Sequence, residues 1–317
     1  MILAATWDTE GLGRAGLELL GAATRLGATL GEEVAFVSLA ASGRGAAEQA
    51  GAHGAARAFV VEGGHTTSVG EGAVAVLAEL VRELGARAAL LPADEQGGEV
   101  APRLAERLGA TAITHAVAVE VADTNPVWTR PVFGGKALAT VSALAEPVVA
   151  TLRRGAFDPA EATGGSAVVE TRTVPAGDGA VEFLGSEAAA DGASLEDATV
   201  IVSGGAGLGS AEAFSELEEL AGLLGGAVGA SLAAVDAGWA PPERQVGLTG
   251  KAVSPDVYFA FGISGASQHL AGIGGAKAVV AVNTDPDAPI FRSARLGVVM
   301  DCRVLVGALL AELRRSA

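Results

Sequence analysis

The strongest constraint on the fold of this chain is a repeated alternation of short apolar runs with segments of helical periodicity. Parallel strands need long crossover connections, which helices commonly supply, so this alternation is typical of a parallel sheet covered by helices. In the first half, the predicted strands are residues 1–7, 33–40, 57–62 and 87–93, and the predicted helices are residues 13–29, 72–84 and 99–109. The sequence therefore predicts an α/β fold for this half.

The pattern changes beyond residue 110, where short extended runs follow one another without helices between them. These runs are residues 114–121, 126–133, 136–144, 147–154 and 166–174. Consecutive strands without crossover helices pair most simply as antiparallel neighbours. We therefore expect an antiparallel extension or an edge hairpin attached to the parallel sheet.

Residues 175–196 are polar and rich in Gly, Ala and acidic residues, and we interpret them as a linker. Alternation then resumes, with strands predicted at 198–204, 257–262, 277–283 and 296–301, and helices at 211–225, from 266 and at 302–315. At 317 residues the chain is long enough for two cores. The predicted domains are an N-terminal α/β domain (1–174), with a parallel sheet and the antiparallel extension, and a C-terminal α/β domain (197–317).

The composition excludes several classes of function. The formal net charge is -16 with only 21 Lys and Arg, so we expect no nucleic-acid partner. No apolar run reaches the roughly 18 to 20 residues of a membrane span, and the first residues lack the basic segment of a signal peptide. The single cysteine, Cys302, fits a reducing compartment, so we expect a cytoplasmic protein. The four histidines have no partners at metal-ligand spacing, so no metal site is expected.

One turn carries unusual chemistry. The stretch GISGASQHLAG, residues 262–272, follows the apolar run VYFAF and offers glycines, hydroxyls, an amide and an imidazole. Ser264, Asn283 and Asp301 each follow or end a predicted strand, and Thr249 of the loop QVGLTGK is positioned to join them. Ligands of open parallel sheets bind outside the carboxyl ends of the strands. We therefore predict a binding site there; the alternative is that Asn283 and Asp301 only cap the segments that follow them.

Two further features leave alternatives open. His269 lies in the first turn of a predicted helix, where the helix N-terminus and an imidazole together would favour a ligand that accepts negative charge. A lone histidine at such a place is otherwise a packed or surface residue. The stretch GGAGLGS, residues 204–210, is either a phosphate-binding loop or a tight turn, because it lacks the last glycine of the dinucleotide fingerprint.

These motifs occur in an order that resembles a known family. The stretches VGASLAAVDAGW, QVGLTGKAVSPDVYFAFGISGASQHLAG and VVAVNTDPDAPIF resemble the alpha subunit of electron transfer flavoproteins. The resemblance is close over residues 197–317 and continues more loosely in the first half, through LLPADEQGGEVAPRLAERLGA, GGKALATV and PVVATLRRGAF. It implies that the C-terminal domain is a Rossmann-like domain that binds FAD.

Carried over position by position, the resemblance assigns FAD-binding positions to two loops and to the strand ends near them. These positions are Ser231, Val246, Gly247, Leu248, Thr249, Ser264, Gly265, Ala266, Ser267, Gln268 and His269, with Asn283, Asp301 and Cys302 on the adenosine side. The resemblance also implies that His269 lies near the N1/O2 edge of the flavin, where negative charge accumulates on reduction. No catalytic residue is implied.

The resemblance further implies an electron carrier without substrate turnover of its own. The expected partners are an electron transfer flavoprotein beta subunit, forming a heterodimer, and flavin dehydrogenases such as acyl-CoA dehydrogenase. A membrane quinone reductase is a candidate acceptor.

The chain departs from the family at three of the matched positions. Ala206 and Leu232 stand where the family has arginines that contact FAD, and Leu248 replaces a common glutamine. These losses motivate an alternative, a paralogue that keeps the fold and the heterodimer but binds an AMP-like nucleotide or no cofactor, with a structural or regulatory role. A second alternative, an NAD(P)-dependent enzyme using GAGLG, lacks the full fingerprint and an evident catalytic acid.

Overall fold

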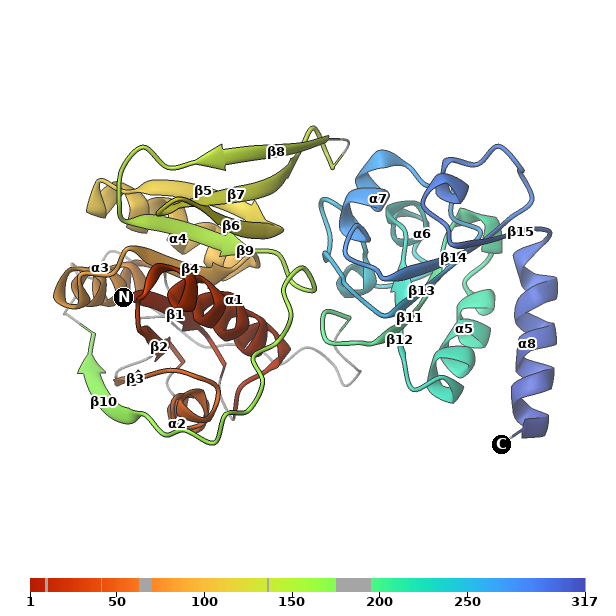
Figure 1. The fold of residues 1–317 in the computed structure, drawn as a ribbon. Helices are drawn as coiled ribbons and strands as arrows, with labels where there is room; N and C mark the ends of the chain where they lie inside the picture. Colours follow the sequence, from red (N-terminus) through yellow and green to blue (C-terminus); the bar gives the residue numbers. More distant parts are fainter. Residues whose placement is uncertain (9–10, 41, 63–69, 136, 175–194, 317) are drawn as a thin grey trace. The chain divides into compact units, whose positions relative to one another are not determined.

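The computed structural model describes residues 1–8, 11–40, 42–62, 70–135, 137–174 and 195–316. The chain forms two compact units, Met1–Glu187 (unit 1) and Ala188–Ala317 (unit 2), both drawn in Figure 1. Each unit has the predicted α/β architecture. The predicted linker, residues 175–196, lies almost entirely outside the described residues, so the linker and the predicted domain boundaries stay predictions.

Unit 1 contains a seven-stranded parallel sheet in the order β10-β3-β2-β1-β4-β9-β5. Its strands are β1 (Ile2–Thr6), β2 (Val34–Ser38), β3 (Arg57–Glu62), β4 (Ala88–Pro92), β5 (Thr111–Ala116), β9 (Val148–Leu152) and β10 (Val168–Thr173). The four strands expected from the first half of the sequence are all present. Three of them (β1, β2 and β4) are buried along their whole length, as continuous apolar runs in a sheet covered on both faces should be.

Helices cover both faces of this sheet. They are α1 (Arg14–Leu30), α2 (Arg44–Ala52), α3 (Glu71–Leu84) and α4 (Glu95–Leu108). Buried residues of α1 and α2 pack into the core on one face, and those of α3 and α4 pack into the core on the other. The sequence reading missed α2, because its sequence RGAAEQAGA consists mostly of small residues and has little amphipathic pattern.

The expectation for the extended runs beyond residue 110 is partly wrong. Only β6 (Ala118–Ala122), β7 (Asn125–Val132) and β8 (Ala137–Ser142) form an antiparallel sheet. The runs containing β5, β9 and β10 belong to the parallel sheet instead, with β9 inserted between β4 and β5 and β10 at the edge beside β3. The reason is visible in β9: its sequence VVATL is buried throughout, which an exposed antiparallel extension cannot provide.

Unit 2 contains a five-stranded sheet, parallel throughout, in the order β12-β11-β13-β14-β15. Its strands are β11 (Val200–Gly204), β12 (Ala227–Ala230), β13 (Val257–Phe261), β14 (Ala278–Asn283) and β15 (Leu296–Val299). Its helical segments are α5 (Glu212–Leu223), α6 (Leu232–Asp236), α7 (Ser267–Gly272), α8 (Cys302–Ser316) and the 3₁₀ turns η2 (Ala206–Leu208), η3 (Pro242–Arg244) and η4 (Pro289–Arg292). The sequence reading missed β12, whose four residues AVGA carry almost no strand signal.

The two faces of this second sheet are covered differently. The long helices α5 and α8 pack side by side on one face, and Leu217, Leu220 and Val306 contribute to its core. The core of the other face is built from Val246, Ile263 and further residues of loops and short helices. This loop-built layer is where the candidate site lies. No described helix has the length and apolar character needed to cross a membrane.

The position of β9 can be tested with a matched pair of substitutions. Val149 of β9 is fully buried, whereas Val168 of β10 is 72% exposed. Val149→Ala should lower the free energy of unfolding by about 2 kcal/mol, because it removes buried methyl groups and leaves a cavity. Val168→Ala should stay within about 0.5 kcal/mol of the parent. Urea unfolding followed by tryptophan fluorescence measures both, and equal costs would contradict the inserted strand.

Candidate functional site

All five strands of unit 2 run in the same direction, so their carboxyl ends share one edge of the sheet. Ser231 follows β12, Gly205 follows β11 and Gly262 follows β13. Asn283 is the last residue of β14, and Asp301 comes two residues after β15. The structure thus brings the strand-end residues predicted from the sequence to one edge, where open α/β sheets hold their ligands.

The loop 245–251 extends this edge beyond β12. The Val246 amide donates to the Ala230 carbonyl at 2.9 Å, and Gln245 forms a parallel bridge with Ala230. Val246 is buried, whereas Thr249 is exposed. The Gln245 Nε2 group donates to Thr249 Oγ1 at 3.0 Å, so the hydroxyl oxygen already accepts a bond. A hydroxyl that accepts one bond can still donate its own proton, so Thr249 can serve as a donor to an acceptor group.

This loop packs directly against the turn that carries the imidazole. The Leu248 amide donates to the Gln268 carbonyl at 2.8 Å. Gly272 of α7 lies so close to Gly247 that a Cβ atom on Gly272 would be 2.5 Å from the Gly247 Cα. Two segments that are separate in the sequence therefore meet because glycine is present at the contact. The structure confirms that the loop and the turn are neighbours.

The turn between β13 and α7 presents small polar residues to solvent. Gly262 and Gly265 both have positive φ, 64° and 86°, and a Cβ on Gly265 would lie 2.3 Å from the Ile290 amide nitrogen. The Ile290 amide in turn donates to the Ser264 carbonyl at 3.0 Å. The exposed residues of the turn are Ser264, Ala266, Ser267 and Gln268. The Ser267 hydroxyl donates to Gln268 Oε1 at 3.3 Å, which leaves the Ser264 hydroxyl and the Gln268 amide NH₂ group as hydrogen-bonding groups for a polar ligand.

The glycine loop after β11 is a tight turn. The Gly205 amide donates to the Phe261 carbonyl at 2.9 Å, and the Gly207 amide donates to the Gly262 carbonyl at 3.0 Å. The amides of Leu208 and Gly209 are also bonded within the loop. A phosphate-binding loop must present free amides to its ligand. These four amides are already satisfied, so of the two readings of GGAGLGS the structure supports the turn.

His269 is the most unusual side chain at this edge. It is only 6% exposed, and its Nε2 atom lies 3.0 Å from the Tyr258 hydroxyl. Its Nδ1 atom is buried and has no hydrogen-bond partner among the described residues. Burial lowers the pKa of His269 to about 4, while hydrogen bonding with the Val246 backbone acts in the other direction. The imidazole is therefore uncharged at neutral pH.

This result corrects the expected electrostatics of the turn. The sequence reading assigned favourable charge to the imidazole and to a helix N-terminus, but α7 has only six residues and the ring is neutral. Burial raises the pKa of the Tyr258 hydroxyl far above its ordinary value, with Ser203 opposing, so the phenol remains a donor. When Tyr258 donates to Nε2, the ring proton lies on Nδ1. His269 then offers a neutral N–H donor in place of a cation.

The three residues expected on the adenosine side all have partners within the protein. Asn283 Nδ2 donates to the Ile263 carbonyl at 3.0 Å, and its Oδ1 accepts from the Asp285 amide at 2.9 Å. Asp301 accepts from the Arg303 amide at 2.9 Å and forms an ion pair with the Arg303 guanidinium at 2.6 Å. Both side chains thus cap the segments that follow them, and a ligand role for them stays a prediction.

Cys302 is buried, and its Sγ atom lies 3.6 Å from the Gly207 carbonyl oxygen. Burial raises the pKa of this thiol, so it stays protonated. Cys302, the first residue of α8, thus contacts the glycine turn.

The three positions at which we expect the sequence to depart from the family all lie on the surface of unit 2. Leu232, directly after Ser231, is 47% exposed, and Leu248 is 65% exposed. Ala206 is also exposed. Large apolar side chains that remain in water next to a polar turn are the kind of surface that a ligand or a partner covers.

The sequence reading missed two residues of this site. Gln245 is the first residue of the loop QVGLTGK and orients Thr249, and its polar character next to the buried Val246 was the available signal. Tyr258 lies inside the apolar run VYFAF, where it looks like an ordinary core residue, and its hydroxyl gave no signal without the position of His269.

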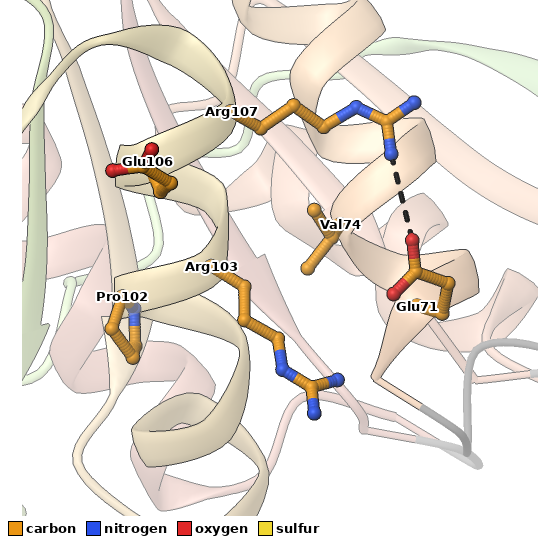
Figure 2. A pocket seen from close by; sticks show the side chains of 6 residues that line it. All are labelled: Glu71, Val74, Pro102, Arg103, Glu106 and Arg107. Carbon is orange, nitrogen blue, oxygen red and sulfur yellow. Dashed lines mark ion pairs between the residues drawn. The ribbon is translucent and has the colours of Figure 1, made fainter.

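Unit 1 has a separate open cavity on its surface, between α3 and α4. It has a volume of about 510 Å³ and is lined by Glu71, Val74, Pro102, Arg103, Glu106 and Arg107. Figure 2 shows Arg107 paired with Glu71, at 3.7 Å, and Arg103 is paired with Glu99 at 2.9 Å. Its arginines are thus matched by carboxylates of the helix surfaces, as in a solvated charged groove.

Comparison with known proteins agrees with the resemblance seen in the motifs. Residues 3–177 match the family model described as electron transfer flavoprotein domain, and residues 194–274 match the electron transfer flavoprotein FAD-binding domain. The chain belongs to the electron transfer flavoprotein alpha-subunit family. FAD is the cofactor for which the domain matched by residues 194–274 is named.

Individual relatives match over most of the chain. The electron transfer flavoprotein subunit alpha of Syntrophomonas wolfei is 38% identical over 90% of this chain and 91% of its own length. That of Paracoccus denitrificans is 40% identical over 89% of this chain and 90% of its own length. That of Pseudomonas aeruginosa is 46% identical over 71% of this chain and 73% of its own length.

The buried neutral His269 makes the stability of unit 2 depend on pH. Its folded pKa of about 4 lies below the unfolded value near 6.5, so the unfolded chain binds the proton first as the pH falls. The contribution of the neutral ring to stability is fully present above about pH 6.5 and decreases as the pH falls to about 4. At pH 5 the free energy of unfolding should be lower by about 2 kcal/mol. Denaturant unfolding of the full chain at pH 8 and pH 5 should show this loss.

His269→Gln is the comparison for this prediction, because the amide can still accept a bond from Tyr258 but does not titrate in this range. The variant should lose markedly less stability than the parent between pH 8 and pH 5. Identical pH dependence in both proteins would show that His269 is not held neutral by burial.

Proposed function

We propose that this protein is an FAD-binding electron carrier, the alpha subunit of a heterodimeric electron transfer flavoprotein. It passes electrons from flavin dehydrogenases, such as acyl-CoA dehydrogenase, to an acceptor, for which a membrane quinone reductase is the candidate. It works in the cytoplasm and turns over no substrate of its own. The observation that carries the proposal is the meeting of the loop 245–251 and the turn 262–269 at the edge of the sheet where the buried His269 lies, through the Leu248 amide and the Gln268 carbonyl.

The residues at this edge fit a flavin cofactor. An isoalloxazine ring offers heteroatoms along its edge that accept hydrogen bonds, and it supplies one- and two-electron redox chemistry when bound. This chain offers the Thr249 hydroxyl, oriented by Gln245, and the His269 ring, held by Tyr258. The exposed hydroxyls of Ser264 and Ser267 suit the polar parts of the cofactor. The chain's contribution is therefore to bind and orient the cofactor and to place neutral donors along its edge.

A second candidate rests on Ala206, Leu232 and Leu248. A site without the two expected guanidinium groups has less attraction for a dinucleotide, and the chain would then keep the fold and the beta-subunit partner while binding an AMP-like nucleotide or nothing. Its role would be structural or regulatory. The identity of the bound cofactor distinguishes the two candidates.

The direct test is to purify the complex of this chain with its beta subunit and to denature it. FAD should be released at near one per heterodimer, measured by absorbance and chromatography. Released AMP without flavin, or a colourless complex that cannot be reconstituted with FAD, favours the second candidate and overturns the first.

The identity of residue 232 should set the flavin's reduction potential. Restoring the cation in Leu232→Arg should raise that potential by roughly tens of millivolts, because a partly screened positive charge favours the reduced cofactor. His269→Ala should lower it, because the substitution removes an N–H donor from the cofactor's edge. Reductive titration of the FAD-loaded complex against a reference dye measures both shifts.

Leu223→Arg is the matched control. Leu223 is similarly exposed, at 41%, but ends α5, which returns to the amino-end edge of the sheet, so the same charge is added away from the site. Its potential should match that of the parent. If Leu232→Arg also leaves the potential unchanged while FAD stays bound, residue 232 does not face the ring.

A further inference from the structure

Unit 1 holds a cluster of cationic side chains at the carboxyl ends of β5 and β9, neighbours in the parallel sheet labelled in Figure 1. Two hydrogen bonds tie the end of β5 to the arginines on either side of His115. Arg130 of β7 donates from Nη2 to the Thr114 hydroxyl at 2.9 Å, and the Arg153 amide donates to the Ala116 carbonyl at 2.9 Å. The backbone segments that carry His115, Arg130 and Arg153 are therefore neighbours.

The backbone at the centre of this cluster is irregular. The pairing of β5 with β9 shifts register between Ile113 and Ala116, and His115 has a left-handed conformation with φ of 56°. A non-glycine residue rarely adopts this conformation, and such bulges re-aim side chains at the rims of sheets. The His115 amide is held at 2.8 Å by the hydroxyl of Thr151, which is buried. A fixed irregular backbone of this kind commonly marks a functional site.

Arg130 has no carboxylate partner among the described residues, unlike arginines such as Arg107 and Arg57. Among the described residues its only hydrogen bond goes to the Thr114 hydroxyl, and no carboxylate lies within ion-pair distance. Its Nε atom is buried without a partner. Arg107, in the groove of Figure 2, is by contrast paired with Glu71. A partly buried guanidinium without a counter-ion is unfavourable, and more so beside other cations.

The electrostatics around His115 agree with this geometry. Although the residue is exposed, partial desolvation of its ring lowers its pKa, and Arg130 and Arg153 lower it further. Both charges identified as acting on the ring are positive. Arg130, which has no carboxylate within ion-pair distance among the described residues, is the positive charge that a bound anion would neutralise here.

We propose that His115, Arg130 and Arg153 form a binding site for a phosphate group of a small molecule. Guanidinium groups bind oxyanions through paired N–H donors, and phosphate carries more charge and more acceptor oxygens than a carboxylate. The site lies at the carboxyl-end edge of a parallel sheet, where α/β folds bind small ligands. It belongs to unit 1 and does not rest on the proposed FAD site of unit 2.

The test is a titration of the full chain with inorganic phosphate, followed by NMR of the histidine C2–H signals. The chain has four histidines, so His115→Gln assigns the signal. Phosphate should shift the His115 signal saturably and raise the pKa of His115. Arg130→Gln should weaken the affinity for phosphate at least about tenfold. Arg130→Lys keeps the charge but loses the paired N–H donors of the guanidinium, so its affinity should lie between those of the parent and Arg130→Gln.

Arg44→Gln is the control. Arg44 is an exposed residue of α2 with only a loose 4.0 Å pair to Glu48, so this substitution removes the same charge from unit 1 and should leave phosphate binding unchanged. Arg153→Gln serves as a second loss-of-site variant if Arg130→Gln does not fold. Acetate in a parallel titration should shift the His115 signal far less than phosphate.

Three outcomes overturn the proposal. No saturable shift in phosphate means that the cluster is not a site. Equal phosphate affinity in the parent, Arg130→Gln and Arg153→Gln means that the shift comes from elsewhere. An acetate response as strong as the phosphate response means that the cluster binds a carboxylate, such as an acidic side chain of a protein partner, and not a phosphate group.

Discussion

In unit 2 the five strands pair in parallel, so every loop that leaves a carboxyl end must lie at the same edge of the sheet. This geometric constraint positions the candidate site before any side chain is considered. It gathers Ser231, the turn 262–269, Asn283 and Asp301, which are far apart in the sequence, and leaves the opposite edge to the amino ends of the strands. The loop 245–251 is added to the edge by its pairing with Ala230. The site therefore depends on strand pairing first and on polar side chains second.

Close backbone approach is the second requirement. Gly207 packs against Gly262, where a Cβ on Gly207 would lie 2.7 Å from the Gly262 Cα, and Gly247 packs against Gly272 in the same way. These contacts bring the glycine turn after β11, the turn after β13, the loop 245–251 and α7 close together, so that they cover the sheet without a long helix. The amides of Gly205, Gly207, Leu208 and Gly209 are bonded within the protein, so the structure favours the interpretation of GGAGLGS as a tight turn. In a chain with 45 glycines, sequence alone cannot separate glycines that approach a ligand from those that approach other backbone.

The parts of the fold that sequence predicted are those with strong local patterns, such as β3 and α1, whose apolar runs and helical period specify them. The prediction was wrong for β9 and β10, because which strands pair depends on contacts between distant residues rather than on the pattern of each run. It missed α2 and β12, which are built of small residues with little periodicity. At the site, the exposed polar turn was evident from composition. The roles of Gln245 and Tyr258 were not, because each acts through another side chain whose position only the fold determines.

The neutral state of His269 changes how this site can influence a bound cofactor. A cation acts at long range and tolerates an error in its position, whereas a neutral N–H donor is effective only at hydrogen-bond distance and in the right direction. Ala206 and Leu232, where the resemblance implies arginines in the family, carry no charge, so such donors are the groups of this edge on which the proposed binding relies. Their placement then becomes decisive, and the structure fixes it through buried groups: Tyr258 holds the His269 ring, and Gln245 holds the Thr249 hydroxyl. In the proposed function the site therefore acts on its ligand through geometry, and Tyr258 and Gln245, which set that geometry, act through the side chains of His269 and Thr249.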